Sequence, residues 1–254
     1  MRKTPTLIAA TLAAATLAAV LPVGRARAQE GEGSLPSAGT DITDVTSLQR
    51  GARNFMNYCS GCHSLKYLRY NRMAQDLKIP EPELKANLMF TSDKPFDAVN
   101  SSMPADSEVW FGKQPPDLSL IARSRGVDYV YAFLKGFYVD KTRPWGANNL
   151  VLPGTAMPPV LSSLQGLQKP VFKNEPDQHG SATMVLVGAE QMTPGALKPE
   201  EYDRFVRDIA NFLDYAAEPV KAKRQSMGVF VILFLLVFFV FSYMLKKEYW
   251  KDVH

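Results

Sequence analysis

The two cysteines of this chain lie three residues apart and are followed at once by a histidine, in the order Cys59-Ser60-Gly61-Cys62-His63. This C-x-x-C-H spacing is typical of c-type haem attachment. Cysteines one turn apart can reach the two vinyl groups of a porphyrin, and the next residue then directs its imidazole at the iron. The sequence therefore predicts one covalent haem c on Cys59 and Cys62, with His63 as a ligand of the iron.

Two other kinds of site fit a pair of cysteines at this spacing. A thioredoxin-like thiol pair would follow a βαβ pattern, which the surrounding sequence does not show. Half of a zinc site would need a second pair of ligands, but the other histidines are His179 and His254 and there is no further cysteine. These absences favour haem attachment over both alternatives.

The sixth position of the iron calls for a thioether, a second imidazole or no protein ligand. A methionine raises the reduction potential, which suits a carrier between a quinol and a soluble cytochrome. Met157 is the predicted ligand because the prolines within residues 153–159 stiffen its loop. Met103 is the second candidate and His179 a bis-histidine alternative, whereas Met56 precedes the attachment site on the proximal side and cannot reach the opposite face.

A helix is predicted to lead into Cys59. Thr46 and Gln49 resemble a capping box, and Gly51 with Ala52 offers a small surface for close helix crossing. Its apolar positions at helical spacing are Leu48, Ala52, Phe55 and Met56.

A second helix is predicted near the end of the domain. Pro199 suits its first turn, and Glu200 and Glu201 suit the positive end of its dipole. Its apolar stripe comprises Tyr202, Phe205, Val206, Ile209, Phe212 and Leu213. The first and last helices of c-type cytochromes cross beside the haem, so we expect these two helices to cross.

Residues 1–28 have the features of a secretory signal peptide. Arg2 and Lys3 precede an apolar run over residues 7–21, and Ala26-Arg27-Ala28 is an A-x-A cleavage pattern. The run is short for a spanning helix, so cleavage before Gln29 is favoured over an uncleaved anchor.

Residues 225–245 contain no charged side chain and predict a transmembrane helix. At about 1.5 Å per residue, a helix of this length crosses a hydrocarbon layer about 30 Å thick. Basic residues border it on both sides, and an uninterrupted apolar surface argues against a buried core helix. The signal peptide sets the orientation: residues 29–220 are expected outside and residues 246–254 in the cytoplasm. In a bacterium this places the main domain in the periplasm, in a mitochondrion in the intermembrane space.

The exported part is acidic although the whole chain is basic. Without the four basic residues of the signal, and the six basic and two acidic residues from Lys221 onward, 19 basic and 23 acidic residues remain, a net charge of about −4. Nucleic acid is therefore not an expected partner. Eight of the acidic residues lie in residues 76–117 against four lysines. This segment is either a solvated loop face or a docking patch for a cationic partner.

Four stretches of the chain resemble the cytochrome c1 family, the haem subunits of quinol–cytochrome c reductase (bc1) complexes. They are residues 55–70 around the haem motif, Pro115-Pro116-Asp117-Leu118-Ser119, Met157-Pro158-Pro159, and Ala216-Ala217-Glu218-Pro219 before the terminal helix. The resemblance covers nearly all of the mature chain. It implies a mainly α fold: a c-type cytochrome domain with loop insertions plus one C-terminal transmembrane helix.

The resemblance also implies roles for single residues. Pro116 is expected to pack against the haem edge and Tyr129 to line the same pocket. Arg123 is expected to hold a haem propionate, because a guanidinium matches a carboxylate, with Arg125 as the nearest substitute. Some bacterial members staple the region before the methionine with an extra cysteine pair. This chain lacks it, so the loop is expected to be held by packing alone, and residues 166–196 are expected to form a surface insertion.

The implied function is one-electron transfer in the bacterial inner membrane. The Rieske iron–sulfur protein is the expected donor, cytochrome c the acceptor, and cytochrome b and the lipid membrane further partners. No side chain is expected to make or break bonds in turnover, since the protein sets potential, burial and docking. The alternatives are a membrane-anchored cytochrome serving a terminal oxidase, a thiol oxidoreductase, and a zinc module.

Overall fold

The computed structural model describes residues 35–176 and 182–252, and the predicted signal peptide, His179 and His254 lie outside these ranges. The described chain is mainly helical, as predicted. Its longer helices are α2 (Val45–Tyr58), α7 (Val127–Lys135), α9 (Pro199–Ala217) and α10 (Lys221–Tyr249). Its short helices are α3 (Tyr70–Asp76), α4 (Glu81–Asn87), η1 (Ala105–Ser107), α5 (Glu108–Phe111), α6 (Ile121–Ser124) and α8 (Ser162–Gln165).

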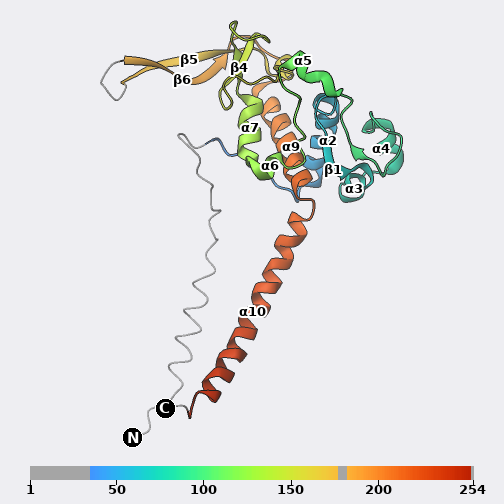
Figure 1. Cartoon of the computed structure of the whole chain (residues 1–254), viewed down its shortest axis with the longest axis vertical. Coiled ribbons are helices and arrows are strands. Elements are labelled where there is room, and N and C mark those ends of the chain that lie inside the picture. Colours follow the sequence, from blue (N-terminus) through green and yellow to red (C-terminus); the bar gives the residue numbers. More distant parts are fainter. Residues whose placement is uncertain (1–34, 177–181, 253–254) are drawn as a thin grey trace. The chain divides into compact units, whose positions relative to one another are not determined.

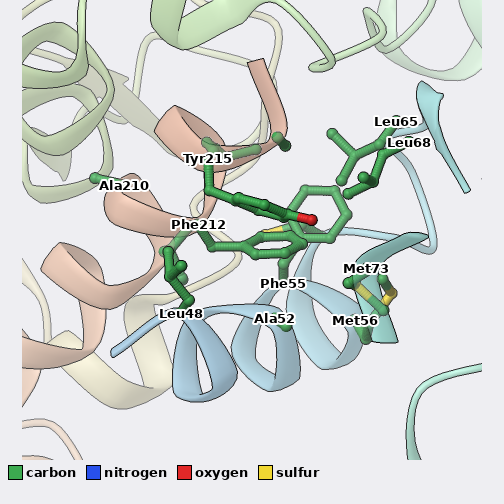
Figure 2. Close-up of a cluster of buried hydrophobic side chains, with 14 of the residues drawn as sticks. Leu48, Ala52, Phe55, Met56, Leu65, Leu68, Met73, Ala210, Phe212 and Tyr215 are labelled. Atoms are coloured by element: carbon green, nitrogen blue, oxygen red, sulfur yellow. The ribbon is translucent and has the colours of Figure 1, made fainter. Parts of the chain in front are cut away.

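Helices α2 and α9 lie side by side at the centre of the domain that precedes α10, and α7 packs along α9 (Figure 1). The predicted apolar stripes of the two helices face each other. Phe55 and Phe212 are completely buried with ring centroids 5.7 Å apart. Figure 2 shows this pair with Met56 of α2, Met73 of α3 and Tyr215 of α9 around it. The predicted crossing of the first and last helices is therefore confirmed.

Gly51 allows α2 and α9 to approach closely. A methyl group at this position would overlap the main-chain oxygen of Asp208 and lie 2.7 Å from the Cβ of Phe212. Beside this contact, the buried carboxylate of Asp208 accepts hydrogen bonds from Ser47 Oγ at 2.7 Å and from Arg50 Nε and Nη2 at 2.6 and 2.8 Å. These three donors compensate the negative charge of Asp208, so its carboxylate can be buried where the two helices cross.

The beginning of α2 differs from the prediction, which placed a capping box at Thr46 and Gln49. The N-cap is Asp44, whose carboxylate accepts a hydrogen bond from Ser47 N at 3.0 Å. An aspartate two residues earlier caps the helix well, because its negative charge also lies at the positive end of the helix dipole. Gln49 instead donates to the carbonyl of Leu77 at 2.8 Å. The start of α9 at Pro199 is as predicted.

Three two-stranded antiparallel sheets lie in the segments between the helices. Their strands are β1 (Leu65–Arg69) with β2 (Ala98–Val99), β3 (Phe137–Val139) with β4 (Ala147–Asn149), and β5 (Gln168–Pro176) with β6 (Ala182–Gln191). The β5–β6 hairpin occupies most of the predicted insertion at residues 166–196. Phe172, Met184 and Val187 on it are exposed, as expected for a surface insertion.

Helix α10 contains the predicted transmembrane segment and is the one helix of the described chain that is long and apolar enough to cross a membrane. Its most apolar window has a mean hydropathy of 2.8 and is not buried by the rest of the described chain. The helix begins before the apolar run, where Lys221 Nζ lies 2.7 Å from Asp214 and Arg224 Nε lies 2.6 Å from Glu218. These two ion pairs join the start of α10 to the end of the preceding domain.

Candidate haem site

The attachment motif forms a tight turn at the carboxyl end of α2. Cys59 is the C-cap residue, with its N–H bonded to the carbonyl of Phe55 at 2.8 Å. The N–H groups of Cys62 and His63 then both donate to the carbonyl of Cys59, at 3.0 and 2.8 Å. Ser60 Oγ is buried and bonds to the carbonyl of Met56 at 2.7 Å. The two thiols and the imidazole are therefore held by a single hydrogen-bonded turn.

The environment of the thiols differs from that of a redox-active pair. Burial raises the pKa of Cys59 to about 12, and burial also raises the pKa of Cys62. Reactive cysteine pairs have lowered pKa values and are commonly stabilised at the amino end of a helix, whereas Cys59 lies at the carboxyl end. Both thiols are thus protonated near neutral pH, which disfavours the thiol oxidoreductase interpretation.

A zinc site is not supported by the described part of the chain. Within residues 35–176 and 182–252, no three His, Cys, Asp or Glu residues are grouped so that they could hold a metal ion. The two cysteines are not joined in a disulfide.

His63 is held in the form that binds iron. Its Nδ1 atom lies 2.8 Å from the carbonyl oxygen of Pro116. Because a carbonyl can only accept, Nδ1 carries the proton and Nε2 keeps a lone pair for a metal. Burial lowers the pKa of His63, opposed by the hydrogen bond to Pro116 and by the charge of Asp117. The neutral imidazole is therefore favoured, with a set ring orientation.

The segment that supplies this carbonyl is fastened to the chain beyond the haem motif. Leu118 N donates to the carbonyl of Ser64 at 2.9 Å, and Lys66 N donates to the carboxylate of Asp117 at 2.9 Å. Tyr67 N donates to Ser119 Oγ at 3.2 Å. Two of the four stretches that carried the sequence resemblance, residues 55–70 and 115–119, are therefore neighbours in space. The main-chain carbonyl of Pro116 accepts a hydrogen bond from His63. The sequence did not predict this contact, because every residue carries a main-chain carbonyl.

The candidate methionine ligands differ in how deeply their side chains are buried. Met56, Met73 and Met89 are buried in the core, whereas Met184 and Met192 are exposed at 69 % and 50 %. Met103 and Met157 are half-buried. Of these two, Met157 packs against the main hydrophobic core of the domain, and Met103 is not among the side chains that pack there in the described chain. The preference for Met157 over Met103 as the iron ligand stays a sequence prediction.

The hydrogen bonds of the loop before Met157 contradict one prediction. The sequence predicted that packing alone would hold it, but the loop is bound by side-chain hydrogen bonds from Arg143, Asn148 and Asn149. Sequence reasoning missed these three residues. The available signal was the Asn-Asn pair just before the Pro-Gly turn, because asparagine side chains bond readily to nearby main chain.

The two candidate propionate ligands have different neighbours. The Arg125 guanidinium lies 5.6 Å from the centroid of the Tyr129 ring, which is stacked on Phe133. Arg123 is exposed on α6. At the end of α9, a hydrogen bond from Arg224 lowers the pKa of Glu218, and the charges of Arg224 and Arg123 add to this effect. Arg125 is therefore the arginine beside Tyr129, and Arg123 stays a sequence prediction.

The residues present fit a covalent haem. One turn offers two thiols and a neutral imidazole with a free nitrogen, and a half-buried thioether packs on the same cluster as the first thiol. Arg123 and Arg125, which follow residues 115–119 in the sequence, offer guanidinium groups to the propionates of a haem.

Comparison with known proteins agrees with this geometry. The model of the Cytochrome C1 family matches residues 38–253. Over 188 residues the chain is 48% identical to cytochrome c1 of Allochromatium vinosum, covering 74% of this chain and 76% of that protein. It is 42% identical to a protein of Nitrosomonas europaea named ammonia monooxygenase gamma subunit, with coverages of 74% and 75%. Cytochrome c1 of Saccharomyces cerevisiae is 26% identical over 68% of this chain and 52% of its own length. The chain belongs to the cytochrome c1 family.

Proposed function

We propose that this chain is the haem-carrying subunit of a quinol–cytochrome c reductase, receiving one electron from a Rieske iron–sulfur protein and passing it to a cytochrome c. The observation that carries the proposal is the pairing of His63 Nδ1 with the Pro116 carbonyl beside the two cysteines. This arrangement presents one neutral imidazole nitrogen at a fixed place next to two thiols. The family membership supports the same assignment.

Each group has a stated task in this proposal. Cys59 and Cys62 would hold the haem through thioether bonds, each formed by addition of one S–H across one vinyl group of the porphyrin. His63 Nε2 and the sulfur of Met157 would be the protein ligands of the iron. Arg125, with Arg123 as the sequence-based candidate, pairs with a propionate, while Pro116 and Tyr129 border the pocket. When bound, haem c supplies the one-electron Fe(III)/Fe(II) couple.

The proposed location is the bacterial inner membrane, with residues 29–220 in the periplasm and residues 246–254 in the cytoplasm. Helix α10 supplies the single span. The predicted signal peptide supports the orientation, because it carries the following domain across the membrane. Cytochrome b and the Rieske protein are the proposed partners within the membrane.

Acid extraction tests the covalent haem directly. After denaturation of the purified mature protein, acidified acetone is expected to leave the pigment on the polypeptide, because two thioether bonds survive unfolding. A reduced-minus-oxidised spectrum of the residual protein measures this. Pigment released into the solvent would contradict thioether attachment at Cys59 and Cys62.

Purification of the intact assembly tests the membership of the complex. When this chain is tagged and extracted in mild detergent, we expect cytochrome b and a Rieske protein to co-purify with it. Recovery of terminal-oxidase subunits instead would support the anchored-cytochrome alternative. Recovery of monooxygenase subunits would match the name of the Nitrosomonas relative.

The acidic segment at residues 76–117 is the proposed docking face for a cationic cytochrome c. The carboxylates of this segment differ in whether they are already bonded within the chain or exposed to a partner. Asp117 is bonded to main-chain N–H groups, and Asp76 is paired with Arg72. Asp106 and Glu108, in contrast, are exposed on η1 and α5. They lie four and two residues before Trp110, which is 55 % exposed. Exposed charges close in sequence to an exposed apolar group suit a partner that must bind quickly and leave after each turnover.

Ionic strength is expected to slow electron transfer to a cationic cytochrome c, because salt screens charges farther apart than about 10 Å at 0.1 M. The measurement is the second-order rate of cytochrome c reduction across a salt series. Changing Asp106→Asn and Glu108→Gln together should flatten the series, whereas the charge-matched control Glu190→Gln with Glu200→Gln should retain it. A wild-type rate independent of salt would remove the docking proposal.

A further inference from the structure

The loop of residues 150–157, which ends at Met157, is bound at several points by three polar side chains. We call Arg143, Asn148 and Asn149 the loop clamp. All three precede the loop in sequence, and two of them belong to β4. Strand β4 pairs with β3, where Asn149 lies opposite Phe137. Strand β3 follows α7 directly, and Arg143 lies in the turn that joins β3 to β4. The clamp is thus built on a hairpin that begins at the end of α7, and this hairpin positions the loop.

Asn149 connects the loop to α7. Its side chain is completely buried, and its Nδ2 donates to the carbonyl of Phe133 at 2.8 Å. Its Oδ1 accepts from the N–H groups of Val151 at 2.8 Å and Leu152 at 3.2 Å. One amide therefore satisfies a carbonyl near the end of a helix and two N–H groups at the start of the loop. Buried main-chain groups cost free energy when they lack such partners.

Asn148 and Arg143 hold Gly154 from its two sides. The N–H of Gly154 donates to Asn148 Oδ1 at 2.7 Å, and its carbonyl accepts from Arg143 Nη2 at 2.8 Å. Gly154 has φ +78°, a left-handed conformation that glycine adopts without strain. Asn148 is held in turn, because its Nδ2 donates to Asp140 at 3.0 Å.

Little freedom remains between Gly154 and Met157. Thr155 N donates to the carbonyl of Leu152 at 3.1 Å, and Met157 N lies 3.3 Å from Thr155 Oγ1. Thr155 is buried, and Pro158 and Pro159 limit the backbone on the other side of Met157. Fixing Gly154 therefore also fixes the position of the methionine three residues later.

We infer that Arg143, Asn148 and Asn149 are positioning residues that keep the Met157 sulfur at the sixth position of the iron and so protect that position from competing ligands. This inference rests on the proposed haem site with Met157 as its ligand. A thioether is a weak ligand for ferric iron, so a flexible loop would release it part of the time. The fraction of molecules with the sulfur displaced then sets how strongly an external ligand binds.

Imidazole binding to the oxidised protein, purified in its intact membrane complex, measures that fraction. Met157→Leu gives the upper limit of affinity, because no sulfur competes. Asn148→Ala and Arg143→Met remove the two bonds to Gly154 from half-buried side chains, so both variants are expected to fold. We expect each to bind imidazole about tenfold more tightly than wild type, from the loss of one hydrogen bond of typical strength. Both should also have a lower reduction potential.

The control is Asn87→Ala, which removes an exposed asparagine bonded to Glu83 on α4, away from the loop. It should leave imidazole affinity and potential at wild-type values. If the two clamp variants match wild type while Met157→Leu differs, the clamp is overturned and the ligand assignment stands. If Met157→Leu also matches wild type, the ligand assignment fails and the inference fails with it.

Discussion

Gly51→Ala is expected to lower the stability of the domain by about 3 kcal/mol or more, although the same change in most helices is stabilising. An alanine in place of glycine usually stabilises a helix interior by roughly 1 kcal/mol. At Gly51 the added methyl group would overlap the Asp208 main-chain oxygen and lie 2.7 Å from the Phe212 Cβ. Both obstacles belong to a rigid helix, so α2 and α9 must separate.

Separation of the two helices would cost more than the local overlap. It would lengthen the bonds from Ser47 and Arg50 to the buried Asp208 carboxylate and loosen the Phe55–Phe212 contact. Overpacking of a core alone costs about 1–3 kcal/mol, and an underpaired buried carboxylate adds to it. For a domain of this size, a loss of about 3 kcal/mol corresponds to a melting temperature roughly 6–12 °C lower.

Thermal unfolding followed by circular dichroism measures this effect. The matched control is Gly188→Ala on β6, where an added Cβ would meet no atom within 4 Å. It should melt close to the wild-type temperature. A Gly51→Ala protein that melts higher than wild type would show that helix propensity outweighs the contact and that α2 and α9 do not cross this closely.

Met157→Leu is expected to abolish the methionine-ligated spectrum and to lower the reduction potential by on the order of a few hundred millivolts. Leucine has a similar volume but no lone pair, so packing against the main hydrophobic core is retained while the iron–sulfur bond is lost. Methionine stabilises Fe(II) relative to Fe(III), which is why its loss lowers the potential. The variant should accept electrons poorly from a Rieske centre as a result.

Redox titration and the far-red charge-transfer band of the oxidised protein are the two measurements. Met103→Leu is the matched control, because Met103 is also half-buried and also followed by a proline. It should keep the band and the potential of wild type. Loss of both in the Met103 variant, with an unchanged Met157 variant, would assign the sixth position to the other sulfur.

Several parts of the fold followed from sequence because they depend on residues close together in the chain. The helices that became α2 and α9 were predicted from apolar spacing. Their crossing was predicted from the helix arrangement of c-type cytochromes, with Gly51 and Ala52 as the small surface that allows close approach. The N-cap was misplaced at Thr46, because Asp44 and Thr46 are both suitable capping residues and the choice depends on where the preceding chain enters the helix.

The surroundings of the site were less predictable, because they depend on main-chain groups and distant segments. The partner of His63 is a carbonyl 53 residues away in sequence, and a carbonyl carries no residue-specific signal. The prediction that packing alone holds the Met157 loop failed for the same reason. The groups that Asn148 and Asn149 bind are the N–H and carbonyl groups of residues 133–154.

The amino-acid sequence by itself determined the candidate attachment motif and the apolar helix that is long enough to anchor the chain in a membrane. Two thiols and an imidazole within five residues need only a local turn, and an uncharged apolar run is long enough by itself to span a bilayer. The tertiary structure alone decided the tautomer of His63 and which arginine lies beside Tyr129. These depend on which surfaces meet when α2, α7 and α9 pack, since burial and distance between remote residues exist only in the folded chain.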